Sequence, residues 1–178
     1  MTAADALIRS LSISPLLVGD LPEAAQFDRE LLSSSVDSIE LDFDQKLGHL
    51  YEDALASLLA SSPNVELIEK NLQVQESKHS TVGELDFLIR QPDGLLTHLE
   101  LAVKFYLAVK TKDGIVYPGP DSRDNYNRKI ERLMSHQLTL TRRYKDRLKP
   151  EYRNAAITVK QLIYGLSLIH ISEPTRPY

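Results

Sequence analysis

Two neighbouring stretches of the chain alternate apolar and polar residues. They are residues 83–89 (GELDFLI) and residues 98–105 (HLELAVKF). Alternation with a period of two is typical of a β-strand that is buried on one face only. The residues between them, Gln91-Pro92-Asp93-Gly94, are typical of a tight turn, so the sequence predicts an antiparallel hairpin.

The same alternation assigns the side chains of this hairpin to two faces. Asp86 and Glu100 share one face, and Lys104 lies on that face two alternations beyond Glu100. Carboxylates and a lysine that converge on the middle of a sheet are costly to bury unless something neutralises them, and a divalent metal is the usual neutraliser. The pattern therefore predicts a metal-dependent hydrolytic site. The residues predicted on the opposite, apolar face are Leu85, Phe87, Leu99, Leu101 and Val103.

The remaining periodicity predicts helices around this hairpin. The strongest helix is expected over about residues 44–60, where apolar residues recur at helical spacing. A second long helix is expected after a cap at Ser122 or Asp124. Shorter helices are predicted over residues 3–11 and 26–33, a first strand over 65–68 and 72–74, and a last strand over 155–164. This order predicts an α/β or α+β domain with helices on a central sheet.

Composition limits the class of protein. A chain of 178 residues with 42% apolar and 26% charged residues has the size and balance of one globular domain. No apolar run is long enough to span a bilayer, and the start lacks a secretory signal pattern, so we expect a cytoplasmic protein that does not bind membranes. The absence of cysteine excludes disulfides and thiolate metal sites.

Charge is distributed unevenly along the chain. Residues 1–100 carry 6 basic and 18 acidic side chains, whereas residues 101–178 carry 15 basic and 7 acidic ones. One interpretation is a surface for an anionic partner supplied by the second half. The alternative is that the two halves attract each other within one fold.

These motifs together resemble a known superfamily. The sequence is similar to the PD-(D/E)XK phosphodiesterases, the restriction-type nucleases, and more closely to a family of uncharacterised bacterial proteins, domain of unknown function 1853. The resemblance extends over about residues 47–164, and residues 100–107 (ELAVKFYL) are its most specific part. It rests also on residues 47–52 (LGHLYE), 83–86 (GELD), 118–120 (PGP) and 136–138 (HQL), and on Arg123, Asp124 and Lys129.

The resemblance implies a restriction-endonuclease-like α/β fold and a set of roles. Asp86 and Glu100 would bind Mg²⁺ or Mn²⁺, with Glu52 as a direct or outer ligand. The metal would polarise a phosphodiester and lower the pKa of the attacking water, and Lys104 would orient that water. The residues expected to hold the substrate are Lys129 and Gln137, on one face of the helix after the hairpin, and Arg123.

The sequence departs from the superfamily pattern at the lysine. Ala102 occupies the position where the superfamily usually has a lysine, and Lys104 lies roughly 6.6 to 7 Å further along the strand. A long lysine stem and a local bulge would close that gap. Also, Glu84-Leu85-Asp86 replaces the Pro-Asp pair of the superfamily name.

The predicted function is Mg²⁺-dependent hydrolysis of phosphodiester bonds in nucleic acid, with DNA as the expected substrate. One alternative is a nucleic-acid-binding module that keeps the fold without turnover, and another is a partner-binding protein whose acidic residues are only surface.

Glu84 is interpreted as a rim residue. Two interpretations of Gln137 have equal weight, a hydrogen-bonded amide in the core and a phosphate ligand. His98 and His136 lack the spacing of a zinc site. The basic run from Arg142 to Lys149 is interpreted mainly as solvated surface, and secondarily as a nucleic-acid contact.

The C-terminal residues resemble something other than a natural protein. Residues 166–176 (LSLIHISEPTR) are similar to the translation of a sequencing-library adapter, and Pro177 and Tyr178 would be read-through. The expected organisation is an N-terminal helical or irregular segment over 1–41, a nuclease-like core over 42–165 that is truncated at its C-terminus, and a non-native tail over 166–178.

Overall fold

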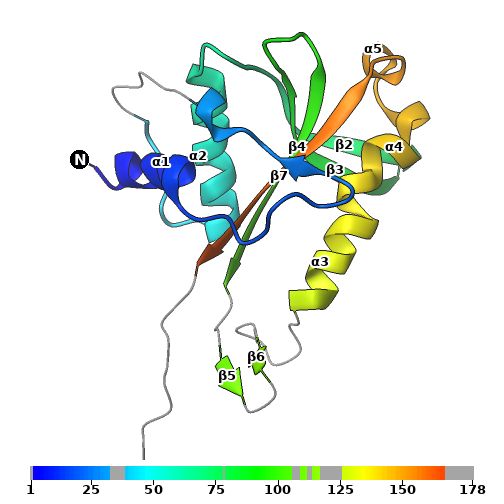
Figure 1. Cartoon of the computed structure of the whole chain (residues 1–178). Helices are drawn as coiled ribbons and strands as arrows, with labels where there is room; N and C mark the ends of the chain where they lie inside the picture. Colours follow the sequence, from blue (N-terminus) through cyan, green and yellow to red (C-terminus); the bar gives the residue numbers. More distant parts are fainter. Residues whose placement is uncertain are drawn as a thin grey trace, which may run out of the picture.

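A five-stranded mixed sheet forms the centre of the computed structural model, which describes residues 2–32, 39–77, 79–105, 109–111, 114–116 and 126–166. Helices α1 (Ala3–Ile13) and α2 (Leu47–Ser61) lie on one side of this sheet, and α3 (Tyr126–Ser135), α4 (Leu140–Arg143) and α5 (Pro150–Arg153) lie on the other (Figure 1). The predicted α/β class is confirmed. In spatial order the strands are β1 (Ala25–Gln26), β7 (Ile157–Leu166), β4 (Leu96–Phe105), β3 (Ser80–Arg90) and β2 (Glu66–Ser77).

The sheet is antiparallel on one side and parallel on the other. β2, β3 and β4 pair antiparallel in chain order, and β7 returns to lie parallel to both β4 and β1. The predicted hairpin is confirmed: the Gly94 amide donates to the Gln91 carbonyl oxygen at 2.9 Å, and Gly94 has φ 83°, which favours glycine. A separate two-stranded sheet consists of β5 (Val109–Thr111) and β6 (Gly114–Val116).

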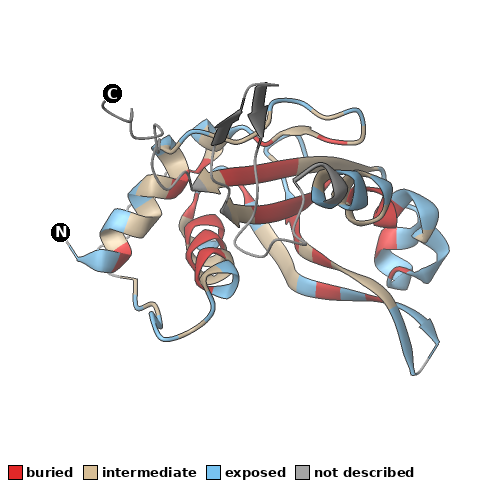
Figure 2. Ribbon diagram, turned by 90° about the horizontal axis from the view of Figure 1, so that it is seen from below, coloured by how far each residue is buried: buried red, intermediate tan, exposed pale blue. Residues whose placement is uncertain are grey.

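The larger apolar cluster lies between the sheet and the first two helices. The apolar stripe of α2 predicted from its spacing is buried, with Ala54 and Leu55 completely inaccessible to solvent. Figure 2 shows the buried residues of this helix on its side toward the sheet. Leu11 of α1 and Phe27 belong to the same cluster, so part of the predicted N-terminal segment shares this core. The sheet contributes Phe87, Ile89, Leu99, Leu101, Leu162 and Tyr164.

The smaller cluster lies on the opposite face, under α4 and α5. Leu85 packs there with Leu72, whereas strict alternation predicted it on the face of Phe87. That prediction is wrong, because Leu85 and Phe87 of β3 pack into clusters on opposite faces of the sheet. Asn71 has φ 55° and lies between the residues that pair with Phe87 and Leu85. Other members of the cluster are Val74, Leu88, Leu96, Leu140, Leu148 and Tyr152.

Several predicted elements differ from those observed. Residues 26–33 contain the end of β1 and a short 3-10 turn, η1 (Arg29–Leu31), instead of a helix, because Gln26 pairs with Gln161 of β7. The first strand, predicted in two pieces over residues 65–68 and 72–74, is one continuous strand, β2. The helix after the hairpin ends at Ser135, and residues 137–139 form a separate 3-10 turn, η2 (Gln137–Thr139), so Lys129 and Gln137 do not share one helix.

Some predictions fall outside the described residues. These include the caps at Ser122 and Asp124, the substrate role of Arg123, and the tail beyond residue 166. In the parts of the chain that the structure describes, no helix has the length and apolar character needed to cross a membrane.

Candidate functional site

Strands β3 and β4 separate at Asp86. Their register runs from the Arg90–Leu96 pair to the Phe87–Leu99 pair and stops there. Beyond that pair the Asp86 carboxylate accepts a hydrogen bond from the Leu101 backbone amide at 2.8 Å. A side chain of β3 thus replaces the backbone as the partner of β4, and it holds the Asp86 carboxylate between the two strands.

Glu100 occupies the neighbouring position on β4 and is almost completely buried, with 3% of its surface exposed. Its Oε1 lies 2.6 Å from Nε2 of His98, which is itself inaccessible to solvent. Asp86 and the side chain of Gln137 lie beside the Glu100 carboxyl and lower its pKa. The structure therefore brings Asp86 and Glu100 together, and it places Gln137 and His98 beside Glu100.

Burial and mutual repulsion raise the pKa values of both carboxyls. Burial is the main cause of the rise in the pKa of Asp86 to about 8, and the charge of Glu100 adds to it. Burial likewise raises the pKa of Glu100 to about 7, although hydrogen bonds from Asp86 and Gln137 oppose the rise. Two acidic groups that share one buried site cannot both ionise without a cation beside them.

His98 is the site residue that sequence reasoning missed. Its burial lowers its pKa to about 4, despite the nearby charge of Asp86, so the ring is neutral at pH 7. A neutral imidazole shares one proton with Glu100 across the 2.6 Å contact, and the ring thereby orients that carboxyl. Its Nδ1 is buried, and no group in the described part of the chain hydrogen-bonds to it. Alternation did place His98 on the face of Glu100, and that was the available signal.

Glu52 approaches this pair from α2. Its negative charge raises the pKa values of both Asp86 and Glu100, after the larger effect of burial. The side chain is 21% exposed, and one of its oxygens lies 3.4 Å from Nδ1 of His49. Glu52 is therefore a neighbouring charge at the more accessible edge of the site.

Lys104 lies on the predicted face, but farther along β4. Each residue from Leu96 to Phe105 pairs in unbroken register with β7, so no bulge shortens the path between Glu100 and Lys104, and the expected bulge is wrong. At the rise of a strand the two Cα atoms are about 13 Å apart. Lys104 is partly exposed and lies opposite Gly165.

The other predicted residues lie around this centre in different settings. Lys129 is exposed on α3. Gln137 reaches Glu100 from η2, immediately after His136, whose Nε2 lies 3.0 Å from the Val82 carbonyl oxygen. Glu84 lies two residues before Asp86 on β3 and accepts a hydrogen bond from Gln73 on the neighbouring strand.

This arrangement has the chemistry of a cation or proton site. Within the described ranges no three histidine, aspartate or glutamate side chains are grouped closely enough to hold a metal ion by themselves. Mg²⁺, however, is usually held by one or two carboxylates, with water and substrate oxygens completing its octahedron. The Asp86 and Glu100 pair satisfies that smaller requirement.

The fold and this cluster define an α/β domain with a pair of carboxyls, one buried and one half-buried, where two central strands separate. The chain belongs to the family described as domain of unknown function (DUF1853), whose model matches residues 19–170. No curated protein and no solved structure matched the chain in comparison.

Proposed function

We propose that this protein hydrolyses phosphodiester bonds of nucleic acid, with DNA as the expected substrate and Mg²⁺ or Mn²⁺ as the cofactor. The observation that carries this proposal is the pair of carboxyls formed by the half-buried Asp86 and the buried Glu100, at the point where β3 and β4 separate. A buried acidic pair with raised pKa values is typical of a functional site, since a purely structural role rarely compensates its cost.

The residues present fit a divalent cation. Asp86 and Glu100 would hold it, and Glu52, at the exposed edge, would contribute through water. When bound, the metal polarises the phosphodiester and lowers the pKa of the attacking water. The hydrogen bonds from His98 and the Leu101 amide keep the two carboxyls in place, and Gln137 lies beside Glu100, so the site is preorganised for a cation.

The element order supports a restriction-endonuclease type of fold. Helix α2 precedes three antiparallel strands, the hairpin of β3 and β4 carries the acidic pair, and a further helix leads to β7 beside β4. The same order was expected from the resemblance to the PD-(D/E)XK phosphodiesterases. In this proposal Lys104 orients water or stabilises negative charge on the phosphate from its position farther along β4.

The test is a nuclease assay with matched variants. Wild-type protein is incubated with labelled single-stranded and double-stranded DNA in Mg²⁺ or Mn²⁺. Loss of a group that holds the metal removes several kcal/mol of transition-state stabilisation, so Asp86→Asn and Glu100→Gln are expected to lower cleavage at least about 100-fold. The control Glu84→Gln changes a carboxylate on the same strand outside the pair, and it is expected to stay within about twofold of wild type.

A second function is favoured by the position of Lys104. The unbroken register with β7 keeps this lysine one alternation beyond the usual position, which would suit a protein that binds nucleic acid without cutting it. Binding with a steep salt dependence but no cleavage in either metal would support that alternative. A protein that neither binds DNA nor takes up Mn²⁺ would instead favour the partner-binding alternative.

A further inference from the structure

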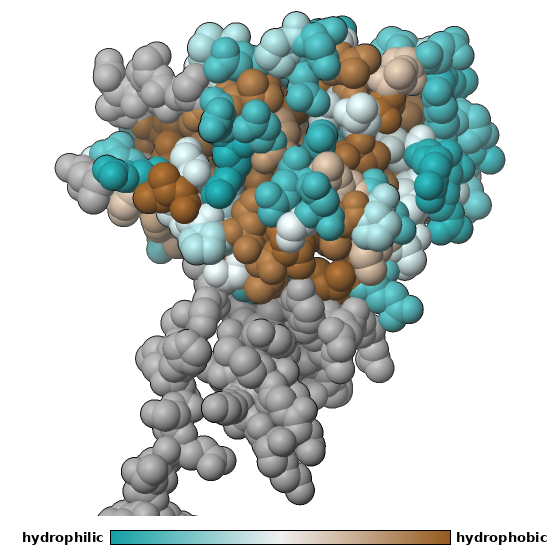
Figure 3. Space-filling view, viewed as in Figure 1, coloured by the Kyte–Doolittle hydropathy of each residue, from teal (hydrophilic) through white to brown (hydrophobic). Residues whose placement is uncertain are grey.

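A second polar site lies on the same face of the sheet as the carboxylate pair. It is a pocket of about 390 Å³ between the start of β7, the segment before β1, and the turn that follows α4. Its uncharged lining is mainly apolar and consists of Leu138, Ala155, Ala156, Ile157 and Val159, together with Thr141. In Figure 3, apolar residues are also visible between polar ones over the middle of the molecule.

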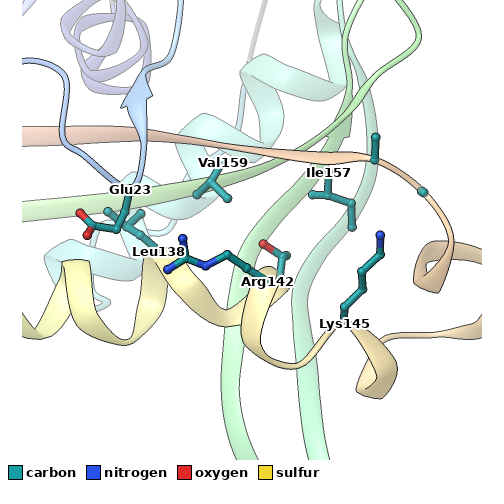
Figure 4. A pocket seen from close by; sticks show the side chains of 9 residues that line it. Glu23, Leu138, Arg142, Lys145, Ile157 and Val159 are labelled. Atoms are coloured by element: carbon teal, nitrogen blue, oxygen red, sulfur yellow. The ribbon is translucent and has the colours of Figure 1, made fainter.

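Three charged side chains line this pocket. Arg142 extends along it toward the end where Glu23 lies, and Lys145 stands at the end near Ile157 (Figure 4). Glu23 comes from the N-terminal part of the chain, and the two cations come from the basic run that the sequence suggested was mainly solvated.

The basic run divides into engaged and available side chains. Arg143 donates to the Ser135 carbonyl oxygen, Arg147 donates to the Glu76 carbonyl oxygen, and Lys149 pairs with Glu69. Arg142 and Lys145 make no side-chain hydrogen bond or ion pair with any described residue. The two cations that line the pocket are thus the two without an internal partner in this run.

Glu23 is also incompletely satisfied. Its Oε2 is buried, and it accepts no hydrogen bond from the residues that the structure describes. A carboxylate accepts hydrogen bonds and cannot donate them, so it selects a ligand group that carries N–H bonds. An apolar pocket with an acceptor at one end and cations along it matches a nucleotide: apolar walls for the base and Arg or Lys for its phosphate.

The pocket adjoins the proposed catalytic site. Val159, in its wall, pairs with His98, and Leu138 directly follows Gln137, which contacts Glu100. On strand spacings of ~4.8 Å and a rise of ~3.3 Å per residue, the Cα atoms of Val159 and Glu100 are about 8 Å apart. A single strand of nucleic acid can therefore extend over both places.

We propose that this pocket binds one nucleotide of the substrate strand, with its phosphate on Arg142 and Lys145 and the amino group of its base on Glu23. The inference rests on the proposed function for its substrate class, and it adds a preference for bases that carry an amino group, such as cytosine. Cytosine offers an N4 amino donor where thymine has an acceptor oxygen, and carboxylates accept hydrogen bonds from that amino group.

The test measures binding without cleavage. Fluorescein-labelled oligodeoxycytidylate and oligodeoxythymidylate of about 12 nucleotides are titrated with the full chain in EDTA, and affinity is read by anisotropy at several salt concentrations. We expect wild type to prefer cytidylate about tenfold, the contribution of one hydrogen bond to a charged group. Glu23→Gln is expected to abolish most of that preference, because an amide can donate to thymine as readily as it accepts from cytosine.

The cations are tested by their salt dependence. Arg142→Ala/Lys145→Ala is expected to weaken both oligonucleotides about tenfold or more and to reduce the slope of log K against log salt by about 0.7, the value for one neutralised phosphate on a single strand. The control Arg143→Ala removes a charge from the same run outside the pocket, and a change below about twofold is expected. Circular dichroism melting verifies that each variant is folded.

The proposal is overturned if wild type binds neither oligonucleotide, or if it binds both equally. It is also overturned if Glu23→Gln keeps the full preference for cytidylate, or if the double variant behaves like Arg143→Ala. Because no step requires cleavage, a failure here is distinguishable from a failure of the nuclease assay.

Discussion

Replacing Glu100 by glutamine is expected to stabilise the metal-free protein at alkaline pH. The pKa of this carboxyl is raised from its ordinary value of 4.5 to about 7, so between these values the folded state binds a proton that the unfolded state has lost. The free energy of unfolding therefore falls as pH rises through that window. Glu100→Gln removes the titrating group and its repulsion of Asp86 while keeping the shape of the side chain.

The magnitude follows from the two pKa values. With 4.5 unfolded and about 7 folded, the loss of stability due to Glu100 alone is about 2.5 kcal/mol between about pH 5 and about pH 8. The charge of Glu100 also raises the pKa of Asp86. Removing that charge removes its repulsion of Asp86, and this gain in stability adds to the effect of Glu100 itself. Relative to wild type, the variant should therefore gain at least about 2 kcal/mol over that interval.

Urea unfolding in EDTA, followed by far-ultraviolet circular dichroism at about pH 5 and about pH 8, gives the stability difference between Glu100→Gln and wild type at each pH. The change in that difference between the two pH values is the predicted quantity. Glu84→Gln, on the same strand as Asp86, is the control for removal of a carboxylate outside the pair. Mg²⁺ at about pH 8 should stabilise wild type and leave Glu100→Gln nearly unchanged. An identical difference between Glu100→Gln and wild type at the two pH values would refute the reasoning, because Glu100 would then ionise as it does in water.

Two further predictions concern packing. Gly83→Ala would place a Cβ atom 2.8 Å from a methyl carbon of the buried Leu140, and we expect a loss of about 1–3 kcal/mol in urea unfolding, whereas Gly48→Ala, with nothing within 4 Å, should be neutral or stabilising. A Gly83→Ala variant as stable as wild type would contradict this packing. Tyr164→Phe removes the hydroxyl that donates to the Leu11 carbonyl oxygen, and its expected cost of about 1 kcal/mol is measured in the same way; an unchanged midpoint would exclude that hydrogen bond.

Short sequence patterns correctly predicted the hairpin of β3 and β4 and the helix α2, because residues close in sequence determine these elements. The alternation around Asp86 and the turn at Gly94 define the hairpin, and the helical spacing of apolar residues defines α2. The expected helix over residues 26–33 was wrong because Gln26 pairs with Gln161, a partner from the other end of the chain that no local window contains.

The site was predictable only in part, for the same reason. Alternation placed Asp86 and Glu100 on one face, but it gave no sign that the strands separate beside them or that His98 is buried against Glu100. The pocket joins Glu23 to Arg142, residues distant in sequence, and its cations look like ordinary surface charge in the sequence. These features depend on contacts between residues that are distant in the sequence.

The place of β7 in the sheet has a consequence for the order of assembly. This strand lies between β1 and β4, although among the described strands it is the last to be synthesised. During translation, β2, β3 and β4 can pair with one another while β1 still lacks its neighbour. Strand β1 is therefore expected to join the sheet only after synthesis has passed Gln161, and such long-range pairing slows the completion of folding.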